Sequence, residues 1–440
     1  LLPTDIYSTI NVNIQDISHH ALLRQLEKYD ASHGCVVVMK TNSGEIKSIV
    51  NLSRTKNGKY YEKFNYAVAE SQEPGSTFKL MSVIATLEND NALSKKLIDT
   101  ENGEIIFYNK YKVRDSKKGG YGKISPSKAF EISSNTGIVK MVYENYKNNP
   151  KKFVDRLYNM GLNDVLGLSI KGEGKPMIPY PGDKNWSGIS LPWMAFGYGI
   201  KLTPLQILSF YNGVANDGEM VKPRFINKIK NPGSSSIKVF EKEILNPSIC
   251  SDTTLAKVQK MMFNVIDKKW GTANKIKSSQ LKMAGKTGTC QIEYTSEETQ
   301  YVSSFVGYFP YENPEYSCIV VVNKPNKKIG YYGGEVAAPV FKEIAEKLYS
   351  KTPKDVIMTS KDPLHRFSKN YKRVELKKKD NDLIIPNLVG MPAMDAIVIL
   401  EQMGLKFLLK GEGKVISQSI KSGIKIDYDK KIILYLLWKH

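Results

Sequence analysis

The stretch Glu73-Pro74-Gly75-Ser76-Thr77-Phe78-Lys79, with the apolar run that continues to Leu87, decides how this chain folds. From Phe78 to Leu87 the sequence is apolar almost all round, as expected of a helix buried at the centre of a domain. Ser76 then stands at the helix N-terminus, where free backbone N–H groups and the helix dipole stabilise negative charge on its oxygen. The i, i+3 spacing places Lys79 on the same helix face. We therefore predict Ser76 as a nucleophile and Lys79 as its base.

Lysine is an unusual base, because its ordinary pKa of about 10.4 keeps it protonated at neutral pH. Burial and a neighbouring cation can lower that pKa by several units. The apolar helix supplies the burial, and Lys286 is the candidate neighbour. A serine–lysine pair is a known alternative to a serine–histidine pair. The five histidines give a Ser-His-Asp arrangement no local support, since none lies between Ser76 and Thr289.

The Ser-x-x-Lys pattern alone is weak, and its context selects one copy. Only Ser76 combines a preceding Pro-Gly turn, an apolar helix behind it and two suitable downstream partners. These partners are Ser133-Ser134-Asn135 and Lys286-Thr287-Gly288-Thr289. The pattern also occurs at Ser53, Ser125, Ser235, Ser279 and Ser422.

The two partner motifs differ in their expected structure. Ser133-Ser134-Asn135 is predicted as a short exposed turn that points a hydroxyl and an amide into one cleft, although a simple helix cap is the better explanation of this tripeptide on its own. Lys286 to Thr289 lies on a strand-like run, where Gly288 would let a substrate backbone approach closely. An ordinary edge strand is the alternative. The three motifs in this order are far more specific than any one of them.

The rest of the pattern predicts an α+β fold. Strand-like runs at 35–40, 45–50, 282–291, 301–309 and 316–323 predict one five-stranded antiparallel sheet that is split in sequence and flanked by helices. The flanking helices are expected at 14–26, which carries an apolar stripe, and at 334–348. A mostly helical insertion is expected at about 100–210, with helix caps at Ser125-Pro126 and Thr203-Pro204. We expect this domain to cover 1–350. A basic linker is expected at 351–382, and a small domain of one helix and three strands at 383–440.

Composition excludes several classes of function. The 440 residues include four cysteines without metal-ligand spacing, so we expect no metal and no cofactor. The net charge of +20 would suit nucleic acid, anionic lipid or an acidic substrate. The lysines are scattered and no nucleic-acid motif is present, so a solvated surface is favoured over a nucleic-acid partner. No apolar run reaches the ~18–20 residues of a membrane span, and the start at Leu1 suggests a fragment of a longer, anchored protein.

The three motifs, separated by 57 and 153 residues (133 − 76 and 286 − 133), resemble the serine transpeptidase and β-lactamase superfamily. Residues 1–350 are similar to monofunctional class B penicillin-binding proteins of the division type, and 383–440 to a PASTA domain. The first similarity rests on Glu73-Pro74-Gly75, Gly197-Tyr198-Gly199, Thr203-Pro204-Leu205-Gln206 and Ser304-Phe305-Val306-Gly307. The second rests on Ile385-Pro386-Asn387-Leu388-Val389-Gly390 and Val415-Ile416-Ser417-Gln418-Ser419.

The resemblance implies a peptidoglycan D,D-transpeptidase. Ser76 would attack the penultimate D-alanine of a stem peptide, and an amine of a second stem peptide would take up the acyl group. Lys79 would accept the serine proton and Ser133 would protonate the leaving group. The remaining implied roles are substrate amide binding for Asn135, the local field for Lys286, substrate binding for Thr287, Gly288 and Thr289, and an oxyanion hole from the N–H groups of Ser76 and Thr289. Cys290, where many relatives carry alanine, is expected to be a packed spectator.

The resemblance also implies partners and place. β-lactams would acylate Ser76, and a membrane-bound glycosyltransferase and divisome proteins would act beside the enzyme at the outer, periplasmic face of the cytoplasmic membrane, in septal synthesis. Alternatives are a D,D-carboxypeptidase or β-lactamase-type hydrolase and a noncatalytic penicillin sensor. The PASTA-like segment and the absence of a deacylating Glu motif between Ser133 and Lys286 favour cell-wall synthesis. Ile420 and Ser422 replace prolines of many PASTA modules, so ligand binding there stays open.

Overall fold

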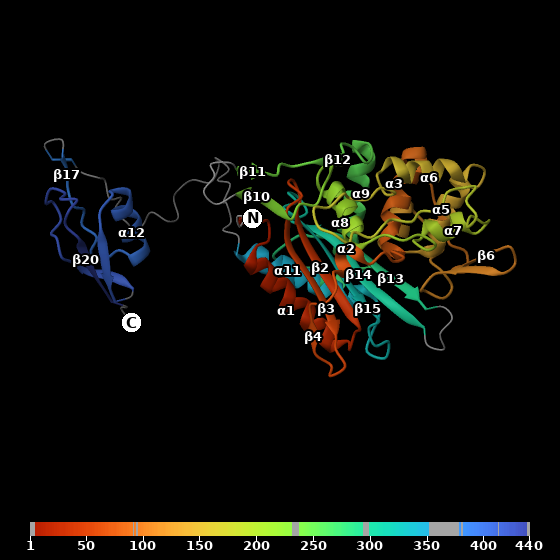
Figure 1. Ribbon diagram of the computed structural model, residues 1–440, viewed down its shortest axis with the longest axis horizontal. Coiled ribbons are helices and arrows are strands. Elements are labelled where there is room, and N and C mark those ends of the chain that lie inside the picture. The colour runs from red at the N-terminus through yellow and green to blue at the C-terminus, as the bar shows by residue number, and fades with distance from the viewer. Residues whose placement is uncertain are drawn as a thin grey trace, which may run out of the picture. The chain divides into compact units, whose positions relative to one another are not determined.

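The computed structural model divides the chain into two compact units, residues 1–353 and 354–440 (Figure 1). Each unit has its own hydrophobic core. The expected basic linker lies almost wholly outside the described residues. The structure describes residues 5–90, 92–93, 96–230, 237–293, 299–351, 378–379, 382–411 and 413–437.

A six-stranded antiparallel sheet forms the centre of the first unit, in the order β13-β14-β15-β2-β3-β4. Its five long strands confirm the predicted five-stranded sheet. A two-residue sixth strand, which was not predicted, pairs with the end of β3. The N-terminal hairpin joins the C-terminal strands through β15 and β2, where Cys318 pairs with Val38. The bounds are β2 His33–Lys40, β3 Ile46–Arg54, β4 Tyr60–Tyr61, β13 Ala284–Ile292, β14 Gln300–Phe309 and β15 Tyr316–Asn323.

Helices cover both faces of this sheet. On one face, α1 (Val12–Lys28) and α11 (Ala338–Lys351) lie side by side (Figure 1). The predicted apolar stripe of α1, from Ile14 to Leu26, is buried against the sheet. On the other face lies α8 (Pro204–Ala215), whose start carries the predicted cap as a capping box of Thr203 and Gln206. Short elements beside these are α2 Tyr66–Ala69, α10 Gly333–Val336 and η3 Asn274–Ile276.

The insertion between the two halves of the sheet is less helical than predicted. Residues 104–114 form a hairpin, because apolar and polar side chains alternate there and Tyr108 and Asn109 adopt the positive φ of a tight turn. Residues 161–189, rich in glycine and proline, contain no helix. The helices that do form are α3 Lys79–Asn89, α4 Pro126–Glu131, α5 Asn135–Tyr146, α6 Pro150–Asn159, α7 Ser190–Ala195 and α9 Asp252–Asp267. The strands are β5 Ile98–Asp99, β6 Glu104–Phe107, β7 Tyr111–Arg114 and β8 Lys123–Ile124.

Two small sheets complete the first unit. One has the order β1-β10-β11 and the other pairs β12 with β9. Within the described residues, no helix combines the length and the apolarity that crossing a lipid bilayer requires. The bounds are β1 Asp5–Ser8, β9 Met220–Val221, β10 Ile226–Lys230, β11 Ile237–Val239 and β12 Ile244–Asn246.

The second unit has the predicted order of one helix and three strands. Helix α12 (Ala393–Gln402) packs its buried Ala396 and Leu400 into a core with Ile432 and Leu434. The sheet order is β18-β20-β19, with β18 parallel and β19 antiparallel to the central strand. The bounds are β18 Phe407–Lys410, β19 Lys414–Gln418 and β20 Ile432–Leu437, with the short pair β16 Lys378–Lys379 and β17 Asp382–Leu383 before them.

Candidate active site

The three motifs meet at one cavity of about 730 Å³ in the first unit. Ser76, Ser133, Asn135, Thr287 and Thr289 all line it. The sheet topology explains this meeting, because β13 is the edge strand next to the insertion that carries the other two motifs. The structure therefore brings together residues that are far apart in the sequence. Lys79 and Lys286 are fully buried, with no side-chain surface left to solvent.

Ser76 lies in a 3-10 turn, η1 (Gly75–Phe78), and not in the regular helix that was predicted to begin there. The α-helix α3 starts at Lys79. Gly75 has a φ of +54°, and its N–H donates to Gly197 O at 3.1 Å. Tyr211, from α8, donates its hydroxyl to Thr77 O at 2.8 Å. The turn that presents Ser76 is thus fixed from two other segments.

Lys79 reaches from the start of α3 to the turn before α5. Its Nζ donates to Ser133 Oγ at 3.0 Å, to Ser133 O at 2.7 Å and to Asn135 Oδ1 at 2.6 Å. None of these partners carries a charge. Burial lowers the pKa of Lys79 to about 7, although the negative charge of Asp115 acts in the opposite direction. A substantial fraction of Lys79 is therefore neutral near pH 7 and able to accept a proton.

Lys286 approaches the same hydroxyl from β13. Its Nζ donates to Ser133 Oγ at 2.9 Å and to Thr287 O at 3.0 Å. Burial, followed by the nearby charge of Lys79, lowers its pKa well below the usual range. Both burial and Lys286 are predicted to lower the pKa of Lys79; in the structure burial is the main cause of that shift. Two ammonium groups this close in a buried site repel each other, so the state in which both lysines are charged is disfavoured.

Ser133 occupies a strained position between the two lysines. Its φ is +57°, in the left-handed region that non-glycine residues seldom adopt. Its Oγ accepts from both Nζ atoms, so its own O–H must donate elsewhere. Asn135 uses its amide oxygen for Lys79 and one N–H for Arg114 O at 2.7 Å, which fixes the plane of the amide.

The strand β13 presents its threonines to the cavity. Thr287 Oγ1 lies 2.8 Å from Thr272 Oγ1, and Thr289 Oγ1 accepts from Gly333 N at 3.0 Å. A Cβ at Gly288 would lie 2.1 Å from Ser304 Oγ, so packing against the neighbouring strand requires glycine at this position. The close approach of a substrate backbone at Gly288 stays a prediction.

Several residues of the site escaped the sequence analysis. Asp115, in the segment taken to be helical, accepts hydrogen bonds from the start of α5. Tyr198 lies in the quoted Gly-Tyr-Gly stretch, yet was not named as a site residue. Its hydroxyl accepts from Gln291 N at 3.1 Å. One sequence signal could have found the tyrosines of this wall: the pair Gly333-Gly334, which allows backbones to approach closely, directly follows Tyr331 and Tyr332. Further lining residues are Tyr301, Tyr331, Tyr332, Lys269 and Thr272.

Cys290 packs behind the nucleophile turn. A Cβ at Gly75 would lie 2.9 Å from Cys290 Cβ, so the two backbones approach closely. Burial raises the pKa of the Cys290 thiol to about 12. The thiol therefore stays protonated and unreactive at neutral pH, as its predicted role of packed spectator requires.

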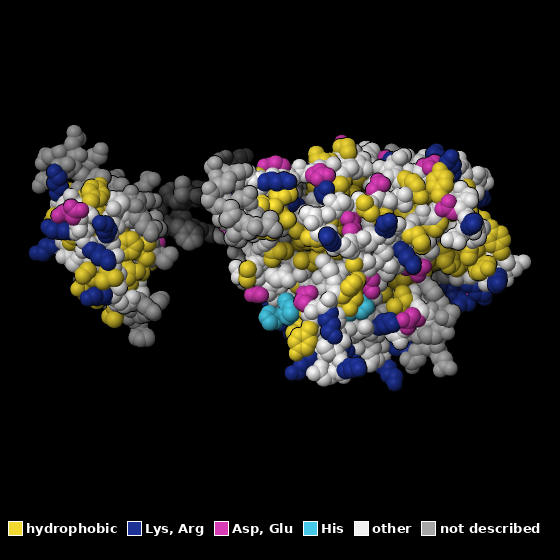
Figure 2. Space-filling view, viewed as in Figure 1, with side chains coloured by type: hydrophobic (Ala, Val, Ile, Leu, Met, Phe, Trp, Pro, Cys, Tyr) yellow, Lys and Arg dark blue, Asp and Glu magenta, His cyan; other side chains and the backbone are white. Residues whose placement is uncertain are grey.

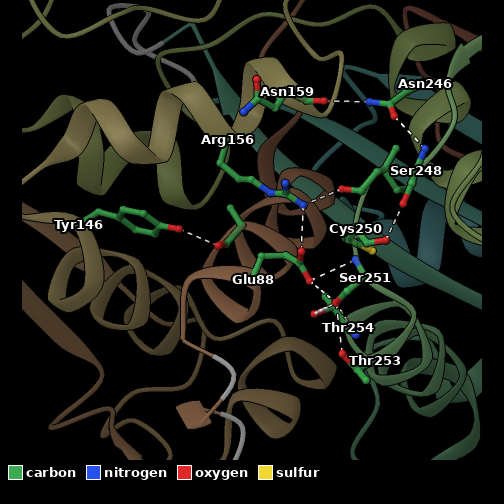
Figure 3. Close-up of polar contacts among 12 residues, drawn as sticks. Glu88, Tyr146, Arg156, Asn159, Asn246, Ser248, Cys250, Ser251, Thr253 and Thr254 are labelled. Atoms are coloured by element: carbon green, nitrogen blue, oxygen red, sulfur yellow. Dashed lines mark hydrogen bonds and ion pairs between the residues drawn. The ribbon is translucent and has the colours of Figure 1, made fainter.

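The far end of α3 is anchored by a separate polar network (Figure 3). Glu88 of α3 accepts from Arg156 Nη2 of α6 at 3.2 Å and from Ser251, the N-cap of α9. Arg156 also donates to Ile249 O at 2.9 Å. Three helices are thereby joined at one carboxylate. Since α9 packs against β13, the network connects both elements that carry the lysines.

On the face of the first unit drawn in Figure 2, charged side chains of both signs are mixed, with Lys and Arg dispersed among Asp and Glu. Within the described ranges, His, Cys, Asp and Glu side chains form no group of three or more that could hold a metal ion. The four cysteines are buried free thiols.

Comparison with known proteins gives the same assignment for both units. The penicillin binding protein transpeptidase domain model matches residues 34–346, and the PASTA domain model matches residues 383–436. The chain is 27% identical over 354 residues to peptidoglycan D,D-transpeptidase FtsI of Buchnera aphidicola, covering 78% of this chain and 58% of that protein. It is 25% identical over 443 residues to stage V sporulation protein D of Bacillus subtilis, covering 98% and 65%. The chain thus spans less than two thirds of either relative.

A solved structure agrees with the fold. The transpeptidase domain of penicillin-binding protein 3 from Burkholderia pseudomallei superimposes with a TM-score of 0.66 at 25% identity, over 79% of this chain and 97% of that one. The α+β serine transpeptidase fold expected from the three motifs is therefore present. The family match covers well over half of the chain. This chain belongs to the penicillin-binding protein transpeptidase family and carries a PASTA domain.

Proposed function

We propose that this chain is a peptidoglycan D,D-transpeptidase, which cross-links stem peptides through an acyl-enzyme on Ser76 and is inhibited when β-lactams acylate the same serine. One observation carries the proposal. The Ser133 hydroxyl lies within 3.0 Å of Lys79 Nζ and 2.9 Å of Lys286 Nζ, beside the cavity that Ser76 lines. Acyl transfer from a peptide needs a neutral amine that accepts the proton of the nucleophile and a hydroxyl that passes a proton to the leaving group.

In acylation, neutral Lys79 takes the Ser76 proton as the serine oxygen attacks the carbonyl carbon of the penultimate D-alanine. The N–H groups of Ser76 and Thr289 stabilise the oxyanion that forms. The bond to the terminal D-alanine then breaks, and its nitrogen takes the proton of Ser133. Ser133 is reprotonated by Lys79, which becomes neutral again. The direct Lys79–Ser133 hydrogen bond supports this relay.

Transfer to the second stem peptide reverses these proton movements. As the attacking amine bonds to the ester carbonyl carbon, it gives one proton to Ser133, and Ser133 passes a proton on to Lys79. Ser76 leaves with a proton from Lys79, and a new peptide bond remains. Thr287 and Thr289 hold the substrate backbone or carboxylate along the edge strand β13. Its position at the sheet edge supports this role, because an edge strand has backbone groups available for pairing.

The wider setting is also part of the proposal. The enzyme acts in the bacterial cell envelope, at the outer, periplasmic face of the cytoplasmic membrane, in septal synthesis beside a glycosyltransferase and divisome proteins. The name of the Buchnera relative supports the transpeptidase activity. We assign the transpeptidase domain to 1–350, a basic linker to 351–382 and the PASTA-like domain to 383–440. The two compact units support this division.

Fluorescent penicillin labelling tests the proposed nucleophile. Wild type should acquire one covalent label, and Ser76→Ala none, while both melt at similar temperatures. The wild-type adduct should persist, because a transpeptidase excludes water as acceptor. Rapid loss of the label to water would indicate a β-lactamase-type hydrolase. Equal labelling of the Ala variant would disprove the role of Ser76.

A further inference from the structure

We propose that Asp115 is a positioning residue of acyl transfer: it fixes the turn that carries Ser133 and Asn135, and it places one negative charge beside the buried lysine pair. This inference rests on the proposed function of the same site. Asp115 lines the cavity and follows β7, so it belongs to a different segment from the turn that it contacts.

The contacts of Asp115 are directed at the first turn of α5. Its Oδ1 accepts from Asn135 N at 2.6 Å and from Thr136 N at 3.1 Å. Its Oδ2 accepts from Thr136 Oγ1 at 2.6 Å, and Ser134 Oγ lies 3.1 Å from both oxygens. Ser134 is itself the N-cap and accepts from Gly137 N. Asp115 therefore satisfies the helix N–H groups that the ordinary cap does not reach, and its charge suits the helix N-terminus.

This arrangement matters because the preceding residue is strained. Ser133 holds a φ of +57° only while the residues around it are fixed. Its N–H bonds to Phe130 O on one side, and Asp115 holds the residues that follow on the other. If Asp115 is removed, the turn can relax and Ser133 Oγ can leave the point where both lysine Nζ atoms reach it. Acylation should slow even though every catalytic side chain is still present.

The charge of Asp115 has a separate consequence. Two charged groups lie near Lys79: Lys286 from β13, which shares Ser133 Oγ with it, and Asp115, which acts on its pKa. The charged residues of the neighbouring elements α4 and β7 have partners of their own. Glu131 is bonded to Asn264 and Trp270, and Arg114 pairs with Glu104. Asp115 raises the pKa of Lys79 against the larger, lowering effect of burial. Loss of this charge should let Lys79 lose its proton at lower pH. The other walls of the cavity carry further titratable groups, among them Tyr198, whose hydroxyl accepts from Gln291 N.

Three variants separate geometry from charge. Asp115→Asn removes the charge; Thr136→Val removes one hydrogen bond to Asp115 and keeps the charge. Glu104→Gln removes a negative charge from the same hairpin, away from Lys79. The measurement is the rate constant of acylation by a fluorescent penicillin between pH 5 and 9, with melting temperatures as the check on folding. This range extends about two pH units to either side of neutrality, where a lysine with a lowered pKa loses its proton.

The expected results differ for each variant. D115N should acylate about tenfold more slowly on the plateau, and its acid limb should move down by about half a pH unit. T136V should acylate more slowly with the limb of wild type. E104Q should match wild type in both. If D115N does not fold, Asp115→Glu, which keeps the charge but shifts the carboxylate, should slow acylation without moving the limb.

The inference is overturned if D115N keeps the limb and the rate of wild type, if E104Q moves the limb as far as D115N does, or if D115E in place of an unfolded D115N acylates at the wild-type rate. Failure of the proposed function gives a different result, because wild type itself would then take up no penicillin. If wild type reacts through Ser76 and D115N acylates in the same way as wild type, only the role of Asp115 is rejected.

Discussion

The two ends of helix α3 hold their charged side chains in opposite ways. At its start, Lys79 meets Lys286 across the Ser133 hydroxyl, and the hydrogen-bond partners of both ammonium groups are neutral. At its end, Glu88 meets Arg156 and the N-cap of α9. The first arrangement leaves a positive charge uncompensated by direct contact; the second pairs opposite charges.

The pKa values follow this difference. At the start of α3, burial lowers the pKa of Lys79 to about 7 and makes the amine a usable base. At the end, burial acts to raise the pKa of Glu88, but hydrogen bonds from Ser251 and Thr254 and the charge of Arg156 bring it below its ordinary value. A buried amine without a counter-ion supports chemistry, and a partly buried carboxylate with one supports the fold.

The largest expected effect is the loss of the base. Lys79→Gln should reduce the acylation rate constant by about 10³-fold, because the variant lacks the buried amine that we propose as the acceptor of the Ser76 proton. Stopped-flow measurement with a fluorescent penicillin provides the rate. Lys140→Gln, which removes the Lys140–Glu101 pair from α5, is the matched control and should acylate normally. A rate for K79Q within tenfold of wild type would contradict the assignment of Lys79.

Removal of the second lysine should have a smaller effect. Lys286→Ala should slow acylation by about 10²-fold, since Ser133 Oγ loses one of the two donors that orient it. The plateau rate constant at high pH should fall, while Ser76 still takes up label given enough time. Normal acylation by K286A would show that Lys79 alone orients the hydroxyl.

The acylation rate of the wild-type enzyme should follow the protonation of Lys79, at the start of α3, near neutral pH. Acylation needs neutral Lys79, so its rate should rise with pH and level off above about 7, falling about tenfold per unit below that. A pH profile of the acylation rate constant checks this. A limb near the ordinary lysine pKa would mean that burial does not keep Lys79 neutral.

The paired end of α3 should respond in stability and not in chemistry. Glu88→Gln should lower the free energy of unfolding by about 2 kcal/mol, because a charge-assisted network of three helices is lost. Since the pKa of Glu88 is lowered on folding, its contribution is present above the unfolded carboxyl pKa and is lost as pH falls through the folded one. Urea unfolding of both proteins at neutral and acid pH should show their difference shrinking on acidification. A large change in acylation by folded E88Q would break the contrast.

The smallest effect is expected for an isolated, partly exposed ion pair within one helix. Glu346 of α11 lies 3.8 Å from Lys342 in an i, i+4 pair near the surface. Glu346→Gln should change the free energy of unfolding by no more than about 0.5 kcal/mol, because water screens the interaction. This variant is the control for E88Q in the same urea experiment. Equal destabilisation by both variants would show that the network between three helices contributes no more to the free energy of unfolding than a single pair within one helix.

Local chemistry determined much of this protein from the sequence alone. The stripe of α1, the caps at Ser125 and Thr203 and the five long strands follow from side-chain period and from hydrogen bonds within four residues. The order of the three motifs likewise selected Ser76 as the candidate nucleophile among six similar serines. Where local signals were mixed, as in the hairpin at 104–114, the prediction of helix was wrong.

Tertiary structure alone decided how the site works. Ser133 receives both lysines only because the sheet edge brings residues 133 and 286 together, and no local rule fixes such a contact. The lowered pKa of Lys79 depends on complete burial, and Asp115 reaches α5 from a separate segment. Gly288 is required by Ser304 on the neighbouring strand. The sequence by itself determined which residues could do the chemistry; packing between distant segments decided their charge states and partners, because burial and distance are properties of the folded chain.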